Sequence, residues 1–239
     1  MSSTNPLSPK LLKGALVKLD TFLVVPVPQV IIFQYNPQTV TRTITPAAAA
    51  AGGEAGGRSS STPSTAQPQP PSESISLSLE LDATDHLEKP ESHPVTMLTG
   101  VADRIAALEM LLYPNTSGQG LLGDLVTSLG FGDALPTPPE RLTVPLTFFV
   151  WGPGRILPVR LTTFTVEEQE FMTTLYPLRA KITMAMQILR EGDYPADSTN
   201  QLSADMADLA WKFYRTQQQV LALANAANSV ESILGMLPI

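Results

Sequence analysis

The residues best suited to chemistry form an acidic, histidine-containing cluster: Asp82, Asp85, His86, Glu88, Glu91 and His93. Carboxylates and imidazoles are common ligands of divalent cations, so this cluster could serve a metal-dependent hydrolase. No histidine pair has the i, i+4 spacing of a helical zinc site, however, and Pro90 and Pro94 indicate a loop. We therefore predict a solvated surface here and no metal site.

The other motifs that could indicate catalysis or cofactor binding give still less support for an enzyme. Residues 118–123 match the G-x-G-x-x-G dinucleotide fingerprint, but a predicted helix and a proline precede them instead of the strand that the motif needs. With two histidines and no G-x-S-x-G motif, the chain does not indicate a serine hydrolase. The neighbouring Glu167, Glu168 and Glu170 are typical of a solvated face. We predict a protein that is not an enzyme and that binds no cofactor.

The composition narrows the range of partners and compartments. The 239 residues include no cysteine, which excludes disulfides and thiolate metal sites. Lys and Arg number 15 against 22 Asp and Glu, so the net charge of −7 provides no basic surface for nucleic acid. No apolar segment approaches the roughly 20 residues of a membrane span, and no signal-peptide core appears. We therefore expect a cytoplasmic protein without membrane insertion.

The elements that must position these residues are mostly strands. Residues 15–19, 30–34 and 40–45 are rich in Val, Ile, Thr and Phe, and the Asn36-Pro37 turn predicts a hairpin between the second and third runs. Residues 46–73 hold 7 Ala, 5 Ser, 5 Pro and 4 Gly, which predicts a disordered loop. Because closing a long loop costs little entropy, we expect the strands on either side of it to pair.

In the remainder of the chain, the spacing of apolar residues changes between the two-residue period of strands and the three-to-four-residue period of helices. Apolar residues at every second position predict strands over residues 75–81 and 179–189, and the Gly152-Pro153-Gly154 turn predicts a hairpin of residues 142–151 and 155–166. Helical spacing predicts one amphipathic helix at residues 101–113. The tail is also helical, from a Ser203 cap, with a shorter second apolar stripe after it. The pattern indicates a β-rich α+β protein.

Six short motifs occur in a characteristic order along the chain: residues 14–19, the FQYNP turn at 33–37, the alternating strand 74–81, and residues 111–114, 149–152 and 178–182. This order, over residues 10–190, resembles the tube-like baseplate proteins, or hub adaptors, of contractile injection systems, the phage-tail-like particles of bacteria. The resemblance implies packed antiparallel sheets or a barrel with one helix, plus a helical C-terminal tail.

The resemblance also implies a function. Such a protein is a structural ring subunit, six copies to a ring, that connects the inner tube to the spike or hub protein and contacts other baseplate subunits. It would work in the cytoplasm of the producing bacterium as part of the assembled particle. The residues for which we expect interaction or structural roles are Phe33, Tyr35, Asn36, Pro37, Trp151, Trp211 and Tyr214.

The C-terminal segment, residues 191–239, leaves an alternative open. Residues 209–214 and 221–225 resemble the LysM module, a small peptidoglycan-binding fold. Residues 215–219 contain no turn residue that would separate its two helices, which favours a single packing or docking helix anchored by Trp211 and Tyr214. The alternative function is a peptidoglycan-binding module that acts at the cell wall.

Overall fold

A computed structural model describes residues 12–22, 25–47, 70–88, 90–114, 125, 127–131, 144–194 and 201–236. It has a β-rich α+β fold in which seven strands form one antiparallel sheet, ordered β2-β1-β5-β6-β7-β4-β3. The strands are β1 (Ala15–Phe22), β2 (Val25–Ile32), β3 (Val40–Thr45), β4 (Ser72–Asp82), β5 (Leu146–Val150), β6 (Ile156–Phe171) and β7 (Pro177–Ile188).

The alternation of side chains along β4 and β7 builds the centre of the core. The predicted inward parity is confirmed, because Ile75, Leu77, Leu79 and Leu81 of β4 are all buried, and so are the alternate apolar residues of β7. The two strands pair in register, with Leu79 opposite Ile182. Their inner faces therefore form one continuous apolar wall.

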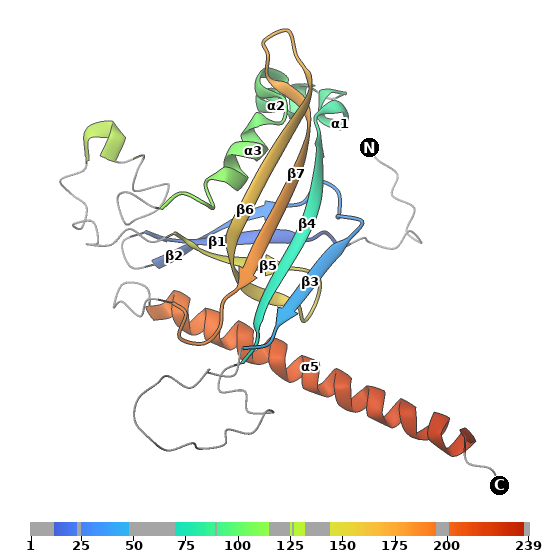
Figure 1. Ribbon diagram of the computed structural model, residues 1–239. Helices are drawn as coiled ribbons and strands as arrows, with labels where there is room; N and C mark the ends of the chain where they lie inside the picture. Colours follow the sequence, from blue (N-terminus) through green and yellow to red (C-terminus); the bar gives the residue numbers. More distant parts are fainter. Residues whose placement is uncertain are drawn as a thin grey trace, which may run out of the picture.

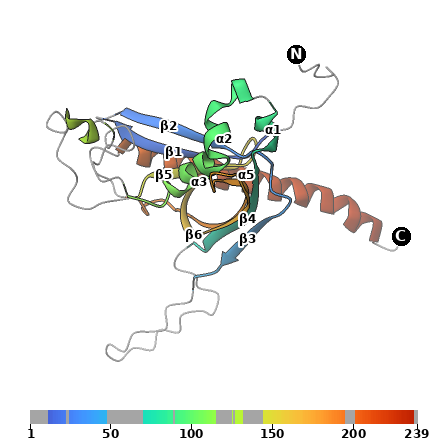
Figure 2. The ribbon, with the colours of Figure 1, turned by 90° about the horizontal axis from the view of Figure 1, so that it is seen from above.

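We expected two packed sheets, and the structure has one sheet that curves until its halves face each other. A β-bulge at Leu161 and Thr163 bends β6, which pairs with β5 at its beginning and with β7 along its length. Strands β1, β2 and β5 consequently run across β4, β6 and β7, and from above the sheet curves around a central axis (Figure 1, Figure 2). Side chains from both halves share one core cluster.

The helices close this curved sheet. Short helical segments, α1 (Thr84–Leu87), η1 (Pro90–Ser92) and α2 (Pro94–Thr99), lead into α3 (Ala102–Glu109), and a further turn is η2 (Thr127–Phe131). The predicted helix over residues 101–113 is confirmed, in shorter form, and its Ile105 and Leu108 enter the core. Gly100 ends α2 with φ of 58°, and a Cβ at this position would lie only 2.1 Å from the carbonyl oxygen of Pro177, which leaves no room for a side chain.

The C-terminal helix α5 (Gln201–Met236) is continuous and crosses the other end of the sheet (Figure 1). It begins before Ser203, which is a buried residue of the first turn and not the predicted cap. Trp211 and Tyr214 are buried in the core cluster, so they anchor α5 to the sheet. Within the described residues, no helix combines the length and the hydropathy needed to cross a bilayer.

Two local predictions were wrong: the hairpin at Asn36-Pro37 and the end of the disordered range. β2 and β3 do not form a hairpin but occupy the opposite edges of the sheet, since Asn36 bonds back to the segment before β1. The pairing of β3 with β4 across residues 46–73 is confirmed. The end of that range is ordered, however, because Ser72 and Glu73 belong to β4 and Glu73 is buried. Residues 48–69 and the motif at 118–123 lie outside the described residues.

Candidate functional site

The FQYNP turn and the Trp151 corner meet in one structural cluster. Phe33 is buried, with its ring centroid 6.4 Å from that of Phe149, and Phe149 stacks on Trp151 at 5.8 Å. A Cβ at Gly14 would lie 2.7 Å from Trp151 and 2.8 Å from Phe33. Phe33 and Trp151 therefore have packing roles that require a glycine at the start of β1.

Asn36 fastens the same turn to the segment before β1. Its Oδ1 accepts a hydrogen bond from the Gly14 amide at 2.9 Å, and its Nδ2 donates to the carbonyl of Leu12 at 2.8 Å. Pro37 is half-buried directly after it. The amide side chain thus acts as a two-sided clasp with its donor and its acceptor on separate atoms. An aspartate in this place would lack the donor, and a serine would carry both functions on the single oxygen of a shorter side chain.

Gln34 joins the turn to the end of β4, a role that the sequence did not reveal. Its Nε2 donates to the Asp82 carbonyl at 2.7 Å, and its Oε1 accepts from the Asp82 amide at 3.0 Å and from Arg104 of α3. Tyr35 points away from the core and donates its hydroxyl to Asp85 at 2.7 Å, which raises the pKa of Tyr35. No sequence signal other than adjacency to the aromatic pair marks Gln34.

The acidic histidine cluster is engaged in bonds within the protein. Arg104 Nη2 lies 2.6 Å from Nδ1 and 3.1 Å from Nε2 of His86, and because a guanidinium only donates, a ring nitrogen of His86 accepts. Burial and the charge of Arg104 lower the pKa of His86, whose ring stacks on His93 at 4.0 Å. A cation at His86 would meet the positive charge of Arg104.

Asp82 of this cluster is likewise occupied. It accepts hydrogen bonds from Thr84 and, at 2.8 Å, from Arg179 of β7. Burial alone would raise the pKa of Asp82, but these bonds outweigh burial and hold the pKa below its usual value. The cluster therefore fastens α1 to the sheet, and among the described residues no three potential metal-binding side chains gather.

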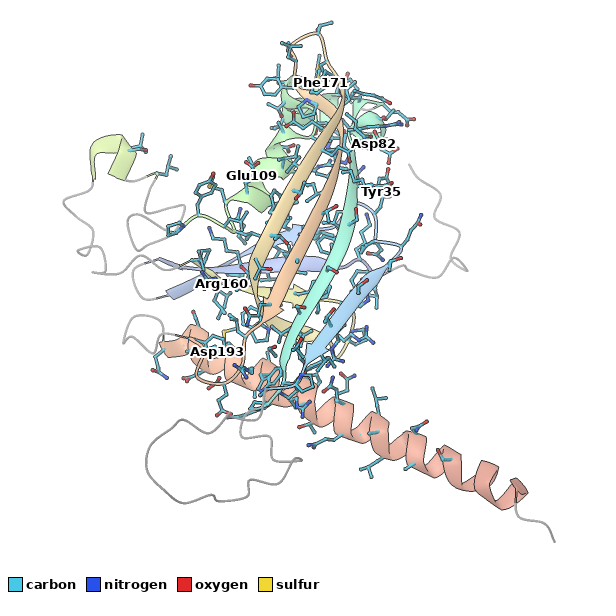
Figure 3. The ribbon with its side chains drawn as sticks, in the orientation of Figure 1. Tyr35, Asp82, Glu109, Arg160, Phe171 and Asp193 are labelled. Atoms are coloured by element: carbon cyan, nitrogen blue, oxygen red, sulfur yellow. The ribbon has the colours of Figure 1, made fainter. Side chains whose placement is uncertain are left out.

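An apolar patch lies at the end of the molecule formed by α2 and the turn between β6 and β7. We call it the tip patch, and Phe171 marks its place in Figure 3. The Val101 amide donates to the Pro177 carbonyl at 3.0 Å, which holds the start of α3 against the hairpin. The large side chains of the patch are between 45% and 80% exposed: Val95, Met97, Leu98, Phe171, Leu175 and Tyr176.

Three acidic residues precede the tip patch on β6. Glu167, Glu168 and Glu170 are exposed on the last part of β6, and of these Glu170 pairs with Arg179 at 3.2 Å. The prediction that these glutamates lie on a solvated face is confirmed. A patch of this kind fits association with another macromolecule better than catalysis.

The two outer strands of the sheet are the remaining candidate surface. Within the described chain, no strand pairs with the outer side of β3 or of β2. An unpaired strand edge presents backbone N–H and C=O groups that can bind a further strand. Between β2, β4 and α3 there is also a hollow of about 260 Å³, slightly smaller than typical ligand pockets.

The site residues that we predicted do not form one surface. Phe33, Trp151, Trp211 and Tyr214 support the core, while Asn36 fixes a turn and Tyr35 remains accessible. The chain matches no model of a known protein family, and comparison with curated proteins finds no relative. Fold and surfaces define a β-rich α+β protein with an open antiparallel sheet and an exposed tip patch.

Proposed function

We propose that this protein is a non-enzymatic structural subunit of a contractile injection system, which forms a baseplate ring between the inner tube and the spike or hub. The observation that carries the proposal is the open sheet, whose two edges have no partner strand within the described part of the chain. A protein with such edges must either blunt them or pair them, and a ring of identical subunits pairs both at once.

The β3 edge has few of the features that prevent association. The strand contains no proline, and its only charged residue, Arg42, directs its guanidinium to Glu73 of β4. Thr41, Thr43 and Thr45 occupy alternate positions, and Ile44 is exposed. Threonine and isoleucine favour the extended conformation, so a strand from a neighbouring subunit could add here.

The β2 edge is open over only half of its length. The Phe33 amide, directly after β2, donates to the Gly14 carbonyl. Because amides alternate in direction along a strand, the odd-numbered residues of β2 direct their amides to β1 and the even-numbered residues direct theirs outward. The even positions include Pro26 and Pro28, which have no N–H group, whereas Val30 and Ile32 retain theirs. The prolines would therefore restrict the register in which β3 of a neighbouring subunit can pair.

Contact between β3 of one copy and β2 of the next is heterologous, so successive contacts close into a ring when the rotation allows it. The tip patch would then face an axial neighbour, such as the inner tube, the spike or another baseplate subunit. The order of sequence motifs supports six copies in the ring and action in the cytoplasm of the producing bacterium. The net charge of −7 and the lack of a long apolar segment in the sequence support the absence of a nucleic-acid or membrane partner. The unbroken α5 gives no support to a LysM module.

The test compares two adjacent prolines in β3. Amides of neighbouring strand residues point in opposite directions, so one of Thr43→Pro and Ile44→Pro removes an outward N–H and the other breaks the bond to β4. We expect the full chain to form a ring by light scattering and electron microscopy. The variant that keeps the wild-type melting transition should lose the ring. A wild-type chain that neither forms a ring nor co-purifies with tube and spike proteins would refute the proposal.

A further inference from the structure

Helix α5 carries two apolar faces, and only one of them is used by the fold. The face that packs on the sheet consists of Ala204, Ala207, Trp211 and Tyr214, all of which are buried. At about 100° per residue these positions lie on one side of the helix. A helix that served only to close the sheet would be polar on the other side.

The opposite side carries a continuous apolar stripe. Its large side chains are between 43% and 71% exposed: Leu202, Met206, Leu209, Phe213, Val220 and Leu223. Thr216 completes the stripe, and its hydroxyl donates to the Lys212 carbonyl at 2.9 Å, so its polar atom is satisfied within the helix. The steps from Leu202 onward alternate between four and three residues without interruption, which is the heptad spacing of a coiled-coil seam.

The stripe also extends beyond the part of α5 that lies against the sheet, since the helix projects from the body of the molecule (Figure 1). The sequence continues the same spacing through Ala227, Val230 and Leu234. The side chains of the stripe whose exposure the structure describes run from Leu202 to Leu223, and an amphipathic helix is the element that packs on such a stripe.

We propose that the stripe binds α5 of a second copy of this chain, with the two helices antiparallel. The charges beside the stripe favour this occupant. The flanking positions hold Ser203, Ala210 and Gln217 on one side and Asp205, Lys212 and Gln219 on the other. The only charges among these six are one carboxylate and one ammonium group seven residues apart.

An antiparallel pair places these opposite charges together. When Met206 lies against Leu209 of the second copy, Asp205 faces Lys212 of that copy, and symmetry creates the same ion pair again. A parallel pair would place Lys212 beside Gln217 instead, with no ion pair. Charge complementarity therefore selects the second copy as occupant and the antiparallel direction. In this register residue 201 of one helix lies opposite residue 214 of the other, so the pair covers the part of the stripe from Leu202 to Phe213.

Both charged groups retain capacity for this contact. Lys212 pairs with Glu191 at 3.1 Å, but both side chains are exposed, and a pair of this kind contributes little. Asp205 Oδ1 accepts from Gln201 at 2.9 Å, which leaves the other carboxylate oxygen for a new donor. The pairing uses neither strand edge and is therefore independent of the proposed ring.

Light scattering and sedimentation of the full chain test the pairing with matched variants. Leu209→Asp should abolish it, whereas Leu221→Asp should not, because Leu221 is similarly exposed (63% against 70%) but lies off the stripe. Lys212→Asp should raise the dissociation constant of the pair about tenfold, and the swap Asp205→Lys with Lys212→Asp should restore it. Circular dichroism verifies that each variant is folded.

Engineered cysteines test the direction, because the chain has none of its own. A mixture of Met206→Cys and Leu209→Cys chains should form a disulfide faster than Leu209→Cys chains alone. The reverse order of rates would refute the antiparallel pair. No self-association through α5, or equal effects of Leu209→Asp and Leu221→Asp, would overturn the proposal.

The edge-proline variant of β3 distinguishes this proposal from the ring. It should leave α5 pairs intact, so that a dimer remains when the ring is lost. Loss of the ring only in the stripe variants would instead place α5 in the ring contact and refute the independent pair.

Discussion

The ion pair between Arg42 and Glu73 connects both strands of the β3 edge to the C-terminal helix. Arg42 Nη2 lies 2.6 Å and its Nε 3.1 Å from Glu73 Oε2. The carboxylate side chain is 3% exposed and the arginine 34% exposed. The guanidinium carbon also lies 5.5 Å from the centre of the Tyr214 ring, in a cation–π arrangement. The two partners are therefore unequally buried.

This inequality predicts unequal costs when one partner is removed. Arg42→Met leaves a buried carboxylate unpaired and should lower the free energy of unfolding by about 3 kcal/mol, with up to about 1 kcal/mol more from the lost cation–π contact. Glu73→Leu leaves a guanidinium that can turn toward water, so we expect a cost of about 1 kcal/mol. The double variant has no charge to desolvate and should also cost about 1 kcal/mol.

Urea unfolding followed by circular dichroism measures these differences at constant m-value. The losses of unfolding free energy in the two single variants, added together, should exceed the loss in the double variant by about 3 kcal/mol. This difference is the coupling energy of the pair. Glu80→Leu serves as the control, because Glu80 is exposed on the same strand, and it should change stability by less than about 0.5 kcal/mol. Equal costs for the two single variants, or an additive double variant, would refute the reasoning.

Four further predictions concern the core, the turns and the histidine cluster. Leu79→Asp places an unpaired charge at a buried position and should cost more than about 4 kcal/mol in urea unfolding. Gly100→Ala should cost at least about 2 kcal/mol, because its Cβ would lie 2.1 Å from the Pro177 carbonyl oxygen. Asn36→Ala loses two hydrogen bonds and should lower the free energy of unfolding by about 1–2 kcal/mol. Because the pKa of His86 is lowered on folding, protonation favours the unfolded chain, so stability should fall as the pH drops below about 6.5, and His86→Gln should reduce this slope.

Each of these has a result that contradicts it. If Leu79→Asp melted like the wild type, the side chain of residue 79 would have to face away from the core. If Gly100→Ala left the free energy of unfolding unchanged, α2 and the β6–β7 hairpin would not be in contact. An Asn36→Ser variant as stable as wild type would show that one of the two bonds suffices. A slope between pH 7 and pH 5 that is the same with and without His86 would assign the titration to other groups.

The strands of the core could be predicted because their signal is local. Every second residue is apolar from Ile75 to Leu81 of β4 and from Leu178 to Ile188 of β7, and a strand with one buried face has few other ways to place such a pattern. The same holds for the β5–β6 hairpin, whose turn chemistry is confined to Gly152, Pro153 and Gly154. In these elements the local pattern and the tertiary structure agree.

The errors arose where two local interpretations were equally good. The Asn36-Pro37 turn suits a hairpin, but the side chain of Asn36 bonds to Leu12 and Gly14, far back in the chain, and this contact sends β3 to the other edge of the sheet. Gln34 and Arg104 are 70 residues apart, and nothing in either neighbourhood indicates their bond. Contacts of this kind depend on how elements meet, which periodicity does not encode.

The same ambiguity in α5 has a functional meaning. Both of its faces are apolar at helical spacing, so periodicity cannot tell which one the sheet covers, and the fold uses the face with Trp211 and Tyr214. The core is then closed by α3 at one end and by α5 at the other, without help from the exposed apolar residues. Substitutions in the α5 stripe, the tip patch or the outer side of β3 should therefore reduce association while leaving the melting transition unchanged. Core substitutions such as Leu79→Asp should instead lower the melting transition. This difference allows each association surface to be tested in a folded protein.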